Sequence, residues 1–328
     1  MKVDPFSEIL RLVNAHSVVS GGFTAGGSWA IRFSAPDKIK YFCVVKGSCW
    51  LRVEGEKVPV RIDEGDVFLL PARRTFVLAG NPSTKPVDAS KIFTPGAGTF
   101  AKLGRGQDFF VIGGHVGLDP ANGGLLANVL PALIHIRASS AQAAILRWLI
   151  DQLERERAAH LPGASLASSQ LAQLIFIQIL RVHLSTSGPL ATGLLRAISD
   201  QRISPALQLM HGDPGRSWHL EELARASSMS RTTFALHFKT VAGVAPVTYL
   251  TEWRMHLAQQ ALREQNVPVS SLACTLGYES ESAFSNAFKR IVGIAPKRYR
   301  TRFRTGDRTS ETKTSLSSIA RDASRQAA

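Results

Sequence analysis

The sequence predicts an α+β protein with a β-rich N-terminal part and an all-helical C-terminal part. Short apolar runs separated by glycine and proline fill the first ~135 residues, and helical periodicity replaces them from Ser139 onward. A repeat of about 50 residues within the helical part is the third observation. The predicted boundaries are 1–138 for a β domain, 139–184 for a helical pair, 185–200 for a linker, 201–304 for a helical domain and 305–328 for a disordered tail.

Length and composition exclude several classes of protein. The chain has 328 residues, of which 45% are apolar and 20% charged, as is typical of a soluble globular protein with about two domains. Three cysteines are too few for a disulfide framework or a four-thiolate zinc site. No uninterrupted apolar run approaches the ~20 residues of a membrane span, and Asp4 and Glu8 lie where a secretion signal would be apolar. We therefore expect a cytoplasmic protein without a membrane partner.

The N-terminal part has the rhythm of an antiparallel barrel or sandwich. Its apolar runs are short, and turn residues such as Gly47, Gly55 and Gly65 separate them at near-regular spacing. The predicted strands are Trp29–Phe33, Tyr41–Val45, Cys49–Val53, Val58–Ile62, Val67–Leu70 and Phe76–Ala79.

Two helices are predicted after the β part. Apolar residues fall at helical spacing from Ile145 through Trp148 to Leu153, and a second apolar helix covers about Leu166 to Leu184 beyond the Pro162-Gly163 break. Two helices joined by a short turn form an antiparallel pair. The sequence leaves two roles open for this pair: forming a homodimer, or covering the β domain.

The repeat in the C-terminal part describes one structural unit twice. A shift of 50 residues aligns Ser230 with Ser280, Phe234 with Phe284, Phe238 with Phe288, Gly243 with Gly293, Pro246 with Pro296 and Tyr249 with Tyr299. Each copy combines a short helix, a tight turn, a serine placed to cap the next helix, a phenylalanine pair and a terminating glycine. This pattern predicts two helix-turn-helix units with recognition helices at about 230–241 and 280–291.

A helical wheel assigns the outward residues of both recognition helices. With about 100° per residue, the phenylalanines define the buried face, and small polar, amide and basic residues lie opposite or flank that side. The candidate base contacts are Thr232, Ala235, Leu236, Glu281, Ser282, Ser285 and Asn286. The candidate phosphate contacts are Arg231, Lys239, Arg254, Lys289 and Arg290. A formal net charge of +14 is consistent with a polyanionic partner, double-stranded DNA.

The segment 218–299 resembles the AraC/XylS family of bacterial transcription regulators. The matching residues include Leu220–Ala224, Met229–Arg231, Leu276–Phe284 and Gly293–Pro296, with His219 where the family tends to have Thr or Ser. Gly65-Asp66-Val67 and Leu130-Pro131 are similar to the cupin-type sensor domain of one branch of that family. The resemblance implies an effector-responsive regulator that binds a promoter or operator in the cytoplasm, takes a small-molecule effector, and contacts RNA polymerase if it activates.

A cupin-type enzyme fused to a DNA-binding module is the alternative prediction. Metal-binding cupins present a His-x-His pair, but residues 41–47 contain no histidine and Phe76 stands where a later histidine is expected. The histidines of the β part, His16, His115 and His135, are scattered. We therefore expect no catalytic residue, metal or cofactor.

Two further features of the β part stay open in the sequence. Cys43 and Cys49 are either a redox pair across a hairpin or two ordinary strand cysteines. The effector pocket is not assigned: aromatic strand residues are candidates for its lining, although such residues more often form core. These candidates are Trp29, Phe42, Trp50 and Phe68.

Overall fold

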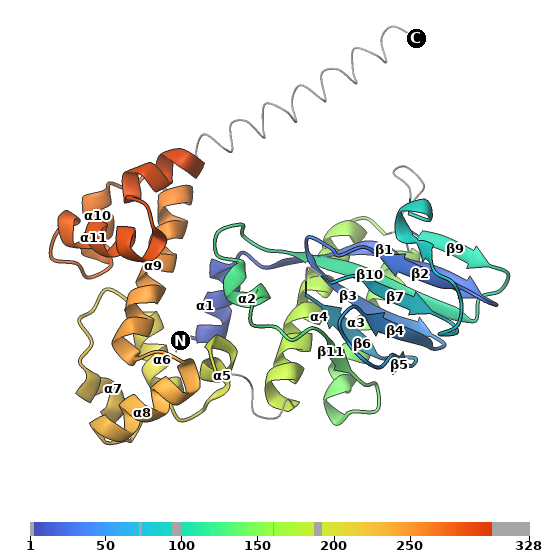
Figure 1. Ribbon diagram of the computed structural model, residues 1–328, viewed down its shortest axis with the longest axis horizontal. Coiled ribbons are helices and arrows are strands. Elements are labelled where there is room, and N and C mark those ends of the chain that lie inside the picture. Colours follow the sequence, from blue (N-terminus) through green and yellow to red (C-terminus); the bar gives the residue numbers. More distant parts are fainter. Residues whose placement is uncertain (1–2, 72–73, 94–99, 160, 187–191, 304–328) are drawn as a thin grey trace, which may run out of the picture. The chain divides into compact units, whose positions relative to one another are not determined.

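The computed structural model describes residues 3–71, 74–93, 100–159, 161–186 and 192–303 (Figure 1). The chain forms two compact units. The N-terminal unit comprises residues 13–199, and the C-terminal unit combines residues 200–303 with the first helix, which ends at Leu12. Residues 305–328, the predicted tail, and 187–191 of the predicted linker lie outside the described residues. The rest of that linker contains the end of one helix and the whole of another, α5 (Leu194–Ser199).

Two β-sheets make up most of the N-terminal unit. The first has the strand order β11-β6-β3-β10-β1-β9, and the second has the order β5-β4-β7-β2-β8. The first sheet contains β1 (His16–Gly26), β3 (Ile39–Lys46), β6 (Val67–Leu70), β9 (Phe100–Gly104), β10 (Phe109–Gly117) and β11 (Ile134–Ile136). The second contains β2 (Ala30–Phe33), β4 (Cys49–Val53), β5 (Val60–Ile62), β7 (Phe76–Ala79) and β8 (Val87–Asp88). Short helical turns are η1 (Ala89–Lys91), α2 (Gly124–Ala127) and η2 (Ala141–Ala143).

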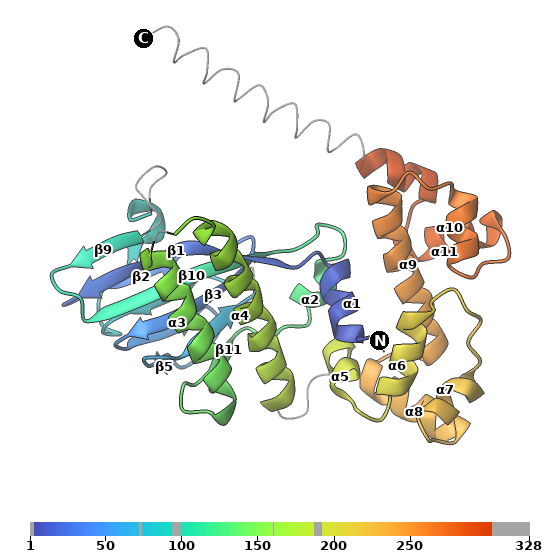
Figure 2. The ribbon, with the colours of Figure 1, turned by 180° about the vertical axis from the view of Figure 1, so that it is seen from behind.

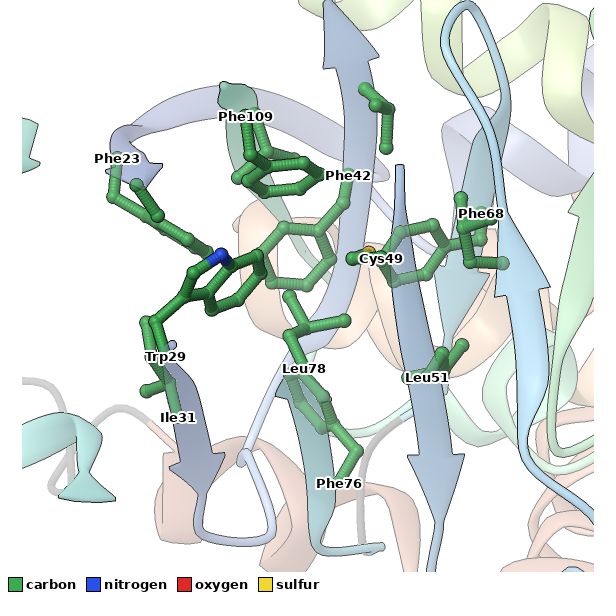
Figure 3. Packing of buried hydrophobic residues seen from close by; sticks show 14 of the residues in the cluster. Phe23, Trp29, Ile31, Phe42, Cys49, Leu51, Phe68, Phe76, Leu78 and Phe109 are labelled. Carbon is green, nitrogen blue, oxygen red and sulfur yellow. The ribbon is translucent and has the colours of Figure 1, made fainter. Parts of the chain in front are cut away.

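The inner faces of the two sheets enclose an aromatic core (Figure 3). Alternate residues of each strand point inward, as in β4, where Cys49, Leu51 and Val53 are buried and Arg52 is exposed. Trp29 packs on Phe109 with ring centroids 4.8 Å apart, and Phe42 stacks on Phe68 at 5.0 Å. Aromatic pairs of this kind add to the free energy gained from buried area alone.

The β-rich character predicted for this region is confirmed, but closure into a barrel is not. The described strands form two separate hydrogen-bonded sheets, and no ladder joins one sheet to the other. Pairing is antiparallel except for β9 beside β1 and β8 beside β2, which are parallel. Sequence alternation identifies the strands, but it does not determine which strand edges pair.

Two helices cover the outer face of the first sheet (Figure 2). They are α3 (Ala144–Ala159) and α4 (Ala164–Thr186), which pack on each other, while α4 also contacts β1 and β11. Gln173 of α4 accepts a hydrogen bond from Ser17 N–H and donates one to the Ala15 carbonyl, at 2.8 and 3.0 Å. By length and composition α4 is apolar enough to cross a membrane. One such helix is weak evidence for a membrane span, and part of its apolar surface, including Ile175, Phe176 and Ile179, is buried in the protein.

A buried carboxylate joins the turn before β6 to the end of β11. Asp66 accepts hydrogen bonds from His135 Nε2 at 2.7 Å, from Ala138 N–H at 2.7 Å and from Asp63 N–H at 3.0 Å. Burial alone would raise the pKa of Asp66, but the hydrogen bonds from His135 and the two amides outweigh it, so the pKa lies below its usual value. The carboxylate therefore fixes the point where the chain leaves the sheets for the helical pair.

The C-terminal unit is helical. Its helices are α1 (Pro5–Leu12), α6 (Ser204–Gly212), α7 (Leu220–Ala226), α8 (Arg231–Ala242), α9 (Pro246–Glu264), α10 (Val269–Thr275) and α11 (Glu281–Val292), and residues 296–303 are helical as well. The first helix, α1, packs on α6 and α9 through a face that includes Phe6, Ile9 and Leu10. This differs from the predicted boundaries, which place residues 1–138 in one domain.

Candidate nucleic-acid interface

The two recognition helices begin and end with the same local chemistry. The Ser230 hydroxyl accepts the Thr233 N–H at 3.2 Å at the start of α8, and the Ser280 hydroxyl accepts the Ala283 N–H at 3.1 Å at the start of α11. Each helix ends at a glycine with positive φ, 82° at Gly243 and 88° at Gly293. The observed helices begin one residue after the predicted 230 and 280 because each serine is the N-cap.

Matching aromatic cores hold the two helices. In the first unit the Phe238 ring packs edge-on against the Tyr249 ring, with ring centroids 5.6 Å apart. The equivalent pair in the second unit, Phe288 and Tyr299, packs in the same way at 5.5 Å. Figure 1 shows α7 and α8 at one end of α9, with α10 and α11 at the other. The long helix α9 contributes to both cores, through Tyr249 near its start and Leu262 near its end. One rigid helix therefore fixes the two recognition helices relative to each other.

The first helix of the first unit keeps a cap despite the unusual residue at its start. The His219 N–H donates to the Glu222 carboxylate at 3.0 Å, and this hydrogen bond lowers the pKa of Glu222. Arg216 also reaches Glu222 at 2.6 Å. The reciprocal interaction from Glu222 therefore supports a helix start that has neither Ser nor Thr.

The outward faces carry the predicted side chains in equivalent places. In α8, Thr232, Leu236 and Lys239 are exposed, and the Leu236 side chain is 64% exposed. In α11, the equivalent positions Ser282, Asn286 and Lys289 are exposed. The flanking residues Ala235, Glu281 and Ser285 are half-buried. The two helices therefore present the predicted central residues to solvent at equivalent positions.

Four of the five predicted phosphate ligands are exposed cations. Arg231 begins α8 and Lys239 lies in its last turn, while Lys289 and Arg290 occupy the last turn of α11. Within the described ranges none of the four forms an ion pair with a carboxylate. Their charges are therefore available to an external anion.

Arg254, the fifth predicted phosphate ligand, is placed differently. Its Nε donates to the Pro214 carbonyl at 2.6 Å and its Nη2 to the Arg216 carbonyl at 2.9 Å, and its guanidinium lies over the Tyr278 ring. Because these bonds occupy a half-buried guanidinium, Arg254 ties the loop before α7 to α9. Arg254 thus has internal partners, and its contact with a phosphate stays a prediction.

The structure adds a cation that the sequence reasoning missed. Lys297 Nζ lies 3.6 Å from Glu281 Oε1, at the N-terminus of α11, and its side chain is exposed. The charge of Glu281, a predicted base contact, is thus partly neutralised. The repeat gave no signal for this cation, since the residue equivalent to Lys297 in the first copy is Val247.

The histidines of the β unit are bonded separately. His16 bonds to the Asn14 carbonyl at 3.0 Å, His115 to the Ser20 hydroxyl at 2.6 Å and His135 to Asp66. Across the described ranges, no group of three or more His, Cys, Asp or Glu side chains could hold a metal ion.

The two cysteines of the β unit lie in different sheets, Cys43 in β3 of the first and Cys49 in β4 of the second. Cys49 belongs to the core between the sheets, whereas Cys43 alternates with Phe42 and Val44, which face that core. Burial raises the pKa of both thiols to about 12. This arrangement does not support a redox pair and favours two ordinary strand cysteines.

Comparison with known proteins covers nearly the whole chain. A family model described as Cupin matches residues 4–185, and one described as Helix-turn-helix domain matches residues 223–302. The DNA-binding domain of AdpA, solved with a target DNA, is 27% identical and covers 32% of this chain and 96% of its own, with a TM-score of 0.31.

Two curated relatives are similar over most of their length. An AraC-like transcription regulator of Streptomyces lividans is 38% identical over 299 residues, which are 91% of this chain and 98% of that protein. The HTH-type transcriptional regulator AlkR of Acinetobacter baylyi is 29% identical over 84% of this chain and 91% of its own.

Proposed function

This chain belongs to the AraC-like family of transcription regulators and is a DNA-binding transcription regulator, and from that premise we propose how it binds its site. The α8 and α11 helices enter two successive segments of the major groove on one face of the duplex. The observation that supports this proposal is the repeated unit: two helices with matching N-caps and aromatic cores, and with exposed faces at equivalent positions, held by α9. The two segments are then about one helical turn apart, ~10 base pairs.

Base contacts come from the outward faces. Asn286 is suited to the paired donor and acceptor of adenine, and Thr232 and Leu236 are suited to thymine methyl groups. One carboxylate oxygen of Glu281 lies near Lys297, and the other is left to accept a hydrogen bond from a cytosine amino group. Ala235, Ser282 and Ser285 complete the two faces as smaller contacts.

Phosphate contacts come from the cations at the ends of these helices. Arg231, Lys239, Lys289 and Arg290 are exposed and lack carboxylate partners among the described residues, which leaves them free to position the protein without selecting sequence. Lys297 joins this set because of its place beside the start of α11.

Two substitutions separate the roles of these residues. Asn286→Ala should weaken binding to the cognate duplex by ~1–3 kcal/mol and leave binding to scrambled DNA nearly unchanged. Arg290→Ala should weaken both and reduce the slope of log K against log salt by about one unit. The measurement is fluorescence anisotropy on both duplexes across a salt series.

Gln201→Ala and Arg225→Ala are the matched controls. Gln201 is an exposed amide outside both recognition helices, and Arg225 is an exposed cation paired with Glu221 on α7. Equal losses of Asn286→Ala on cognate and scrambled DNA would contradict its base contact. A footprint limited to one groove segment would contradict the two-segment arrangement.

Self-association through the helical pair is the second part of the proposal. Ile145 and Trp148 of α3 are more than half exposed, and Leu174 of α4 is 49% exposed. Ile145 also lines a groove with Gln178 and Arg181 of α4. Apolar side chains gathered on an exposed helical face indicate a protein contact, and a second copy supplies the same face.

Sedimentation of the full chain tests the dimer. Trp148→Glu should convert dimers at micromolar concentration into monomers because it places a charge in an apolar contact. Leu161→Glu, at an equally exposed leucine in the turn between α3 and α4, is the control and should sediment as the wild type does. A wild-type monomer at these concentrations would leave α3 and α4 as a cover for the sheet alone.

The β unit is proposed to act as the effector sensor of a cytoplasmic bacterial regulator. An effector shifts the population of conformations only by as much as its affinity differs between them. The relatives are named as regulators, and we propose no catalytic role for the β unit. RNA polymerase is a partner if the output is activation.

A further inference from the structure

A cavity of about 330 Å³ lies between the two sheets of the N-terminal unit. Strands β1, β3 and β10 of the first sheet form one wall, and β2, β7 and the η1 turn form the other. The volume is at the lower end of the range typical of small-molecule sites, ~300–1,000 Å³. It therefore fits a compact ligand of one ring with a short substituent.

Missing side chains create this space. Gly21 of β1 pairs with Gly113 of β10, which pairs in turn with Phe42 of β3, so two of three neighbouring positions in the sheet have no side chain. Gly113 faces the core because it alternates with Val111, a core residue on the same strand. A Cβ atom at Gly113 would approach the Phe42 ring to 3.0 Å. The register thus leaves a gap where other strand positions fill the core.

Aromatic rings line the apolar end of the cavity. Phe33 stacks on Phe76 with centroids 4.7 Å apart and planes 9° from parallel, and Phe42 lies edge-on to Phe76 at 5.7 Å. Phe42 and Phe76 point into the space between the sheets in Figure 3. Phe93 closes this group at 6.1 Å from Phe33. Faces and edges at these angles favour an aromatic guest over a saturated one.

A lysine, Lys40, lies at the polar end of the cavity. Lys40 lies two residues before Phe42 on the same face of β3, and it is half-buried in the cavity lining. Burial lowers its pKa, against the opposing effect of Asp37. Lys40 forms no ion pair within the described part of the chain. A half-buried ammonium without a carboxylate partner is stabilised when a ligand supplies an anion.

Neutral hydrogen-bonding groups lie beside Lys40. His115 is paired with Lys40 in the sheet register and bonds to Ser20, another lining residue. Burial and the charge of Lys40 lower the pKa of His115, so the imidazole is neutral near pH 7 and keeps a hydrogen-bonding edge. The hydroxyl-bearing residues Ser34 and Ser90 also line this cavity.

We propose that this cavity binds a small aromatic carboxylate, with its ring among Phe33, Phe42 and Phe76 and its carboxylate at Lys40. The ring gains from the aromatic wall, and the carboxylate completes the missing ion pair. That such a ligand is the effector rests on the proposed function, whereas its binding to the cavity does not.

Calorimetric titration of the full chain tests the site with three probes. We expect 3-phenylpropionate to bind, and 3-phenylpropanamide, which has the same ring without the charge, to bind at least tenfold more weakly. Octanoate keeps the charge and replaces the ring with an acyl chain, so it should also bind more weakly than 3-phenylpropionate. These comparisons use the wild-type protein and need no substitution to fold.

Substitutions then locate the carboxylate. Lys40→Met should weaken 3-phenylpropionate binding at least tenfold, Lys40→Arg should largely retain it, and Lys38→Met, at an exposed neighbouring lysine, should leave it unchanged. No binding of any probe, or equal affinity for acid and amide, would overturn the site. Tighter binding of octanoate would overturn the aromatic preference.

The effector role has a separate readout. If 3-phenylpropionate binds through Lys40 without changing DNA affinity or the footprint, the cavity stands and the sensor proposal fails. If DNA binding through α8 and α11 fails while the probe still binds, the DNA-contact proposal fails and the cavity is unaffected.

Discussion

Acid should destabilise the C-terminal unit through one buried histidine. His211 of α6 is 6% exposed, its ring stacks on Trp253 at 4.0 Å, and its Nε2 lies 2.8 Å from the Tyr249 hydroxyl. Burial lowers its pKa from 6.5 to about 4, and the opposing charge of Asp4 does not compensate. The folded unit therefore holds a neutral imidazole where the unfolded chain takes up a proton.

The sign and size of the effect follow from this pKa difference. Protonation favours the unfolded chain below about pH 6.5, and the loss of stability continues until the folded imidazole is protonated near pH 4. At 1.36 kcal/mol per pKa unit, about 2 kcal/mol is lost between pH 7 and pH 5, and about 3 kcal/mol in total. His211→Gln keeps a polar partner for Tyr249 but loses the stacking on Trp253, so the variant should be less stable than the wild type at pH 7. Because glutamine does not titrate, the variant should lose less unfolding free energy on acidification.

Hydrogen exchange of α9 peptides measures the unfolding free energy of this unit separately from the β unit. The wild type and His211→Gln should differ in slope between pH 7 and pH 5 by about 1 kcal/mol per pH unit. His219→Asn, which keeps a capping side chain at the start of α7, is the control and should have the wild-type slope. Equal slopes for wild type and His211→Gln would refute the argument, as would an NMR titration of His211 centred near 6.5.

Two further substitutions test the local chemistry of each unit. Asp66→Asn should destabilise the N-terminal unit by about 2 kcal/mol or more, since it removes a charged acceptor of three hydrogen bonds, and exchange in β6 and β11 peptides measures this loss; Asp63→Asn, at a largely exposed carboxylate, should have a small effect. Ser280→Ala should cost about 1 kcal/mol in the stability of α11 and weaken DNA binding, because it removes the N-cap. Ser285→Ala, later in the same helix and away from the cap, should leave urea unfolding unchanged.

The C-terminal architecture was predictable because its determinants are local. A capping serine, a phenylalanine pair and a glycine repeat within twenty residues, so comparison of the two copies identifies both recognition helices without tertiary information. The outward faces of α8 and α11 followed from the same residues, since a buried phenylalanine face determines the opposite one.

The remaining features depend on partners distant in sequence. Arg254 was predicted as a phosphate contact, but the carbonyl of Pro214, 40 residues away in sequence, accepts a hydrogen bond from its guanidinium. The first helix, α1, has an apolar face whose partner helices lie about 200 residues further along the chain. The predicted closure into a barrel is not confirmed for a similar reason. Strand alternation predicts which residues are buried, but it leaves the pairing of sheet edges undetermined.

The recognition helices of the two helix-turn-helix units share their main buried and capping residues and differ on the surface proposed to meet DNA. The caps, aromatic pairs and terminal glycines are shared, whereas Leu236 of α8 has Asn286 as its equivalent in α11. A leucine distinguishes bases chiefly by apolar contact with a methyl group, while an asparagine can form a paired hydrogen bond with one base edge. Fixed buried residues hold both helices in the same geometry, so differences in selectivity must come from these exposed positions. If the proposed contacts hold, we therefore expect the second segment to be the more stringently selected half of the site, and the first to contribute more through shape, methyl contacts and phosphate binding.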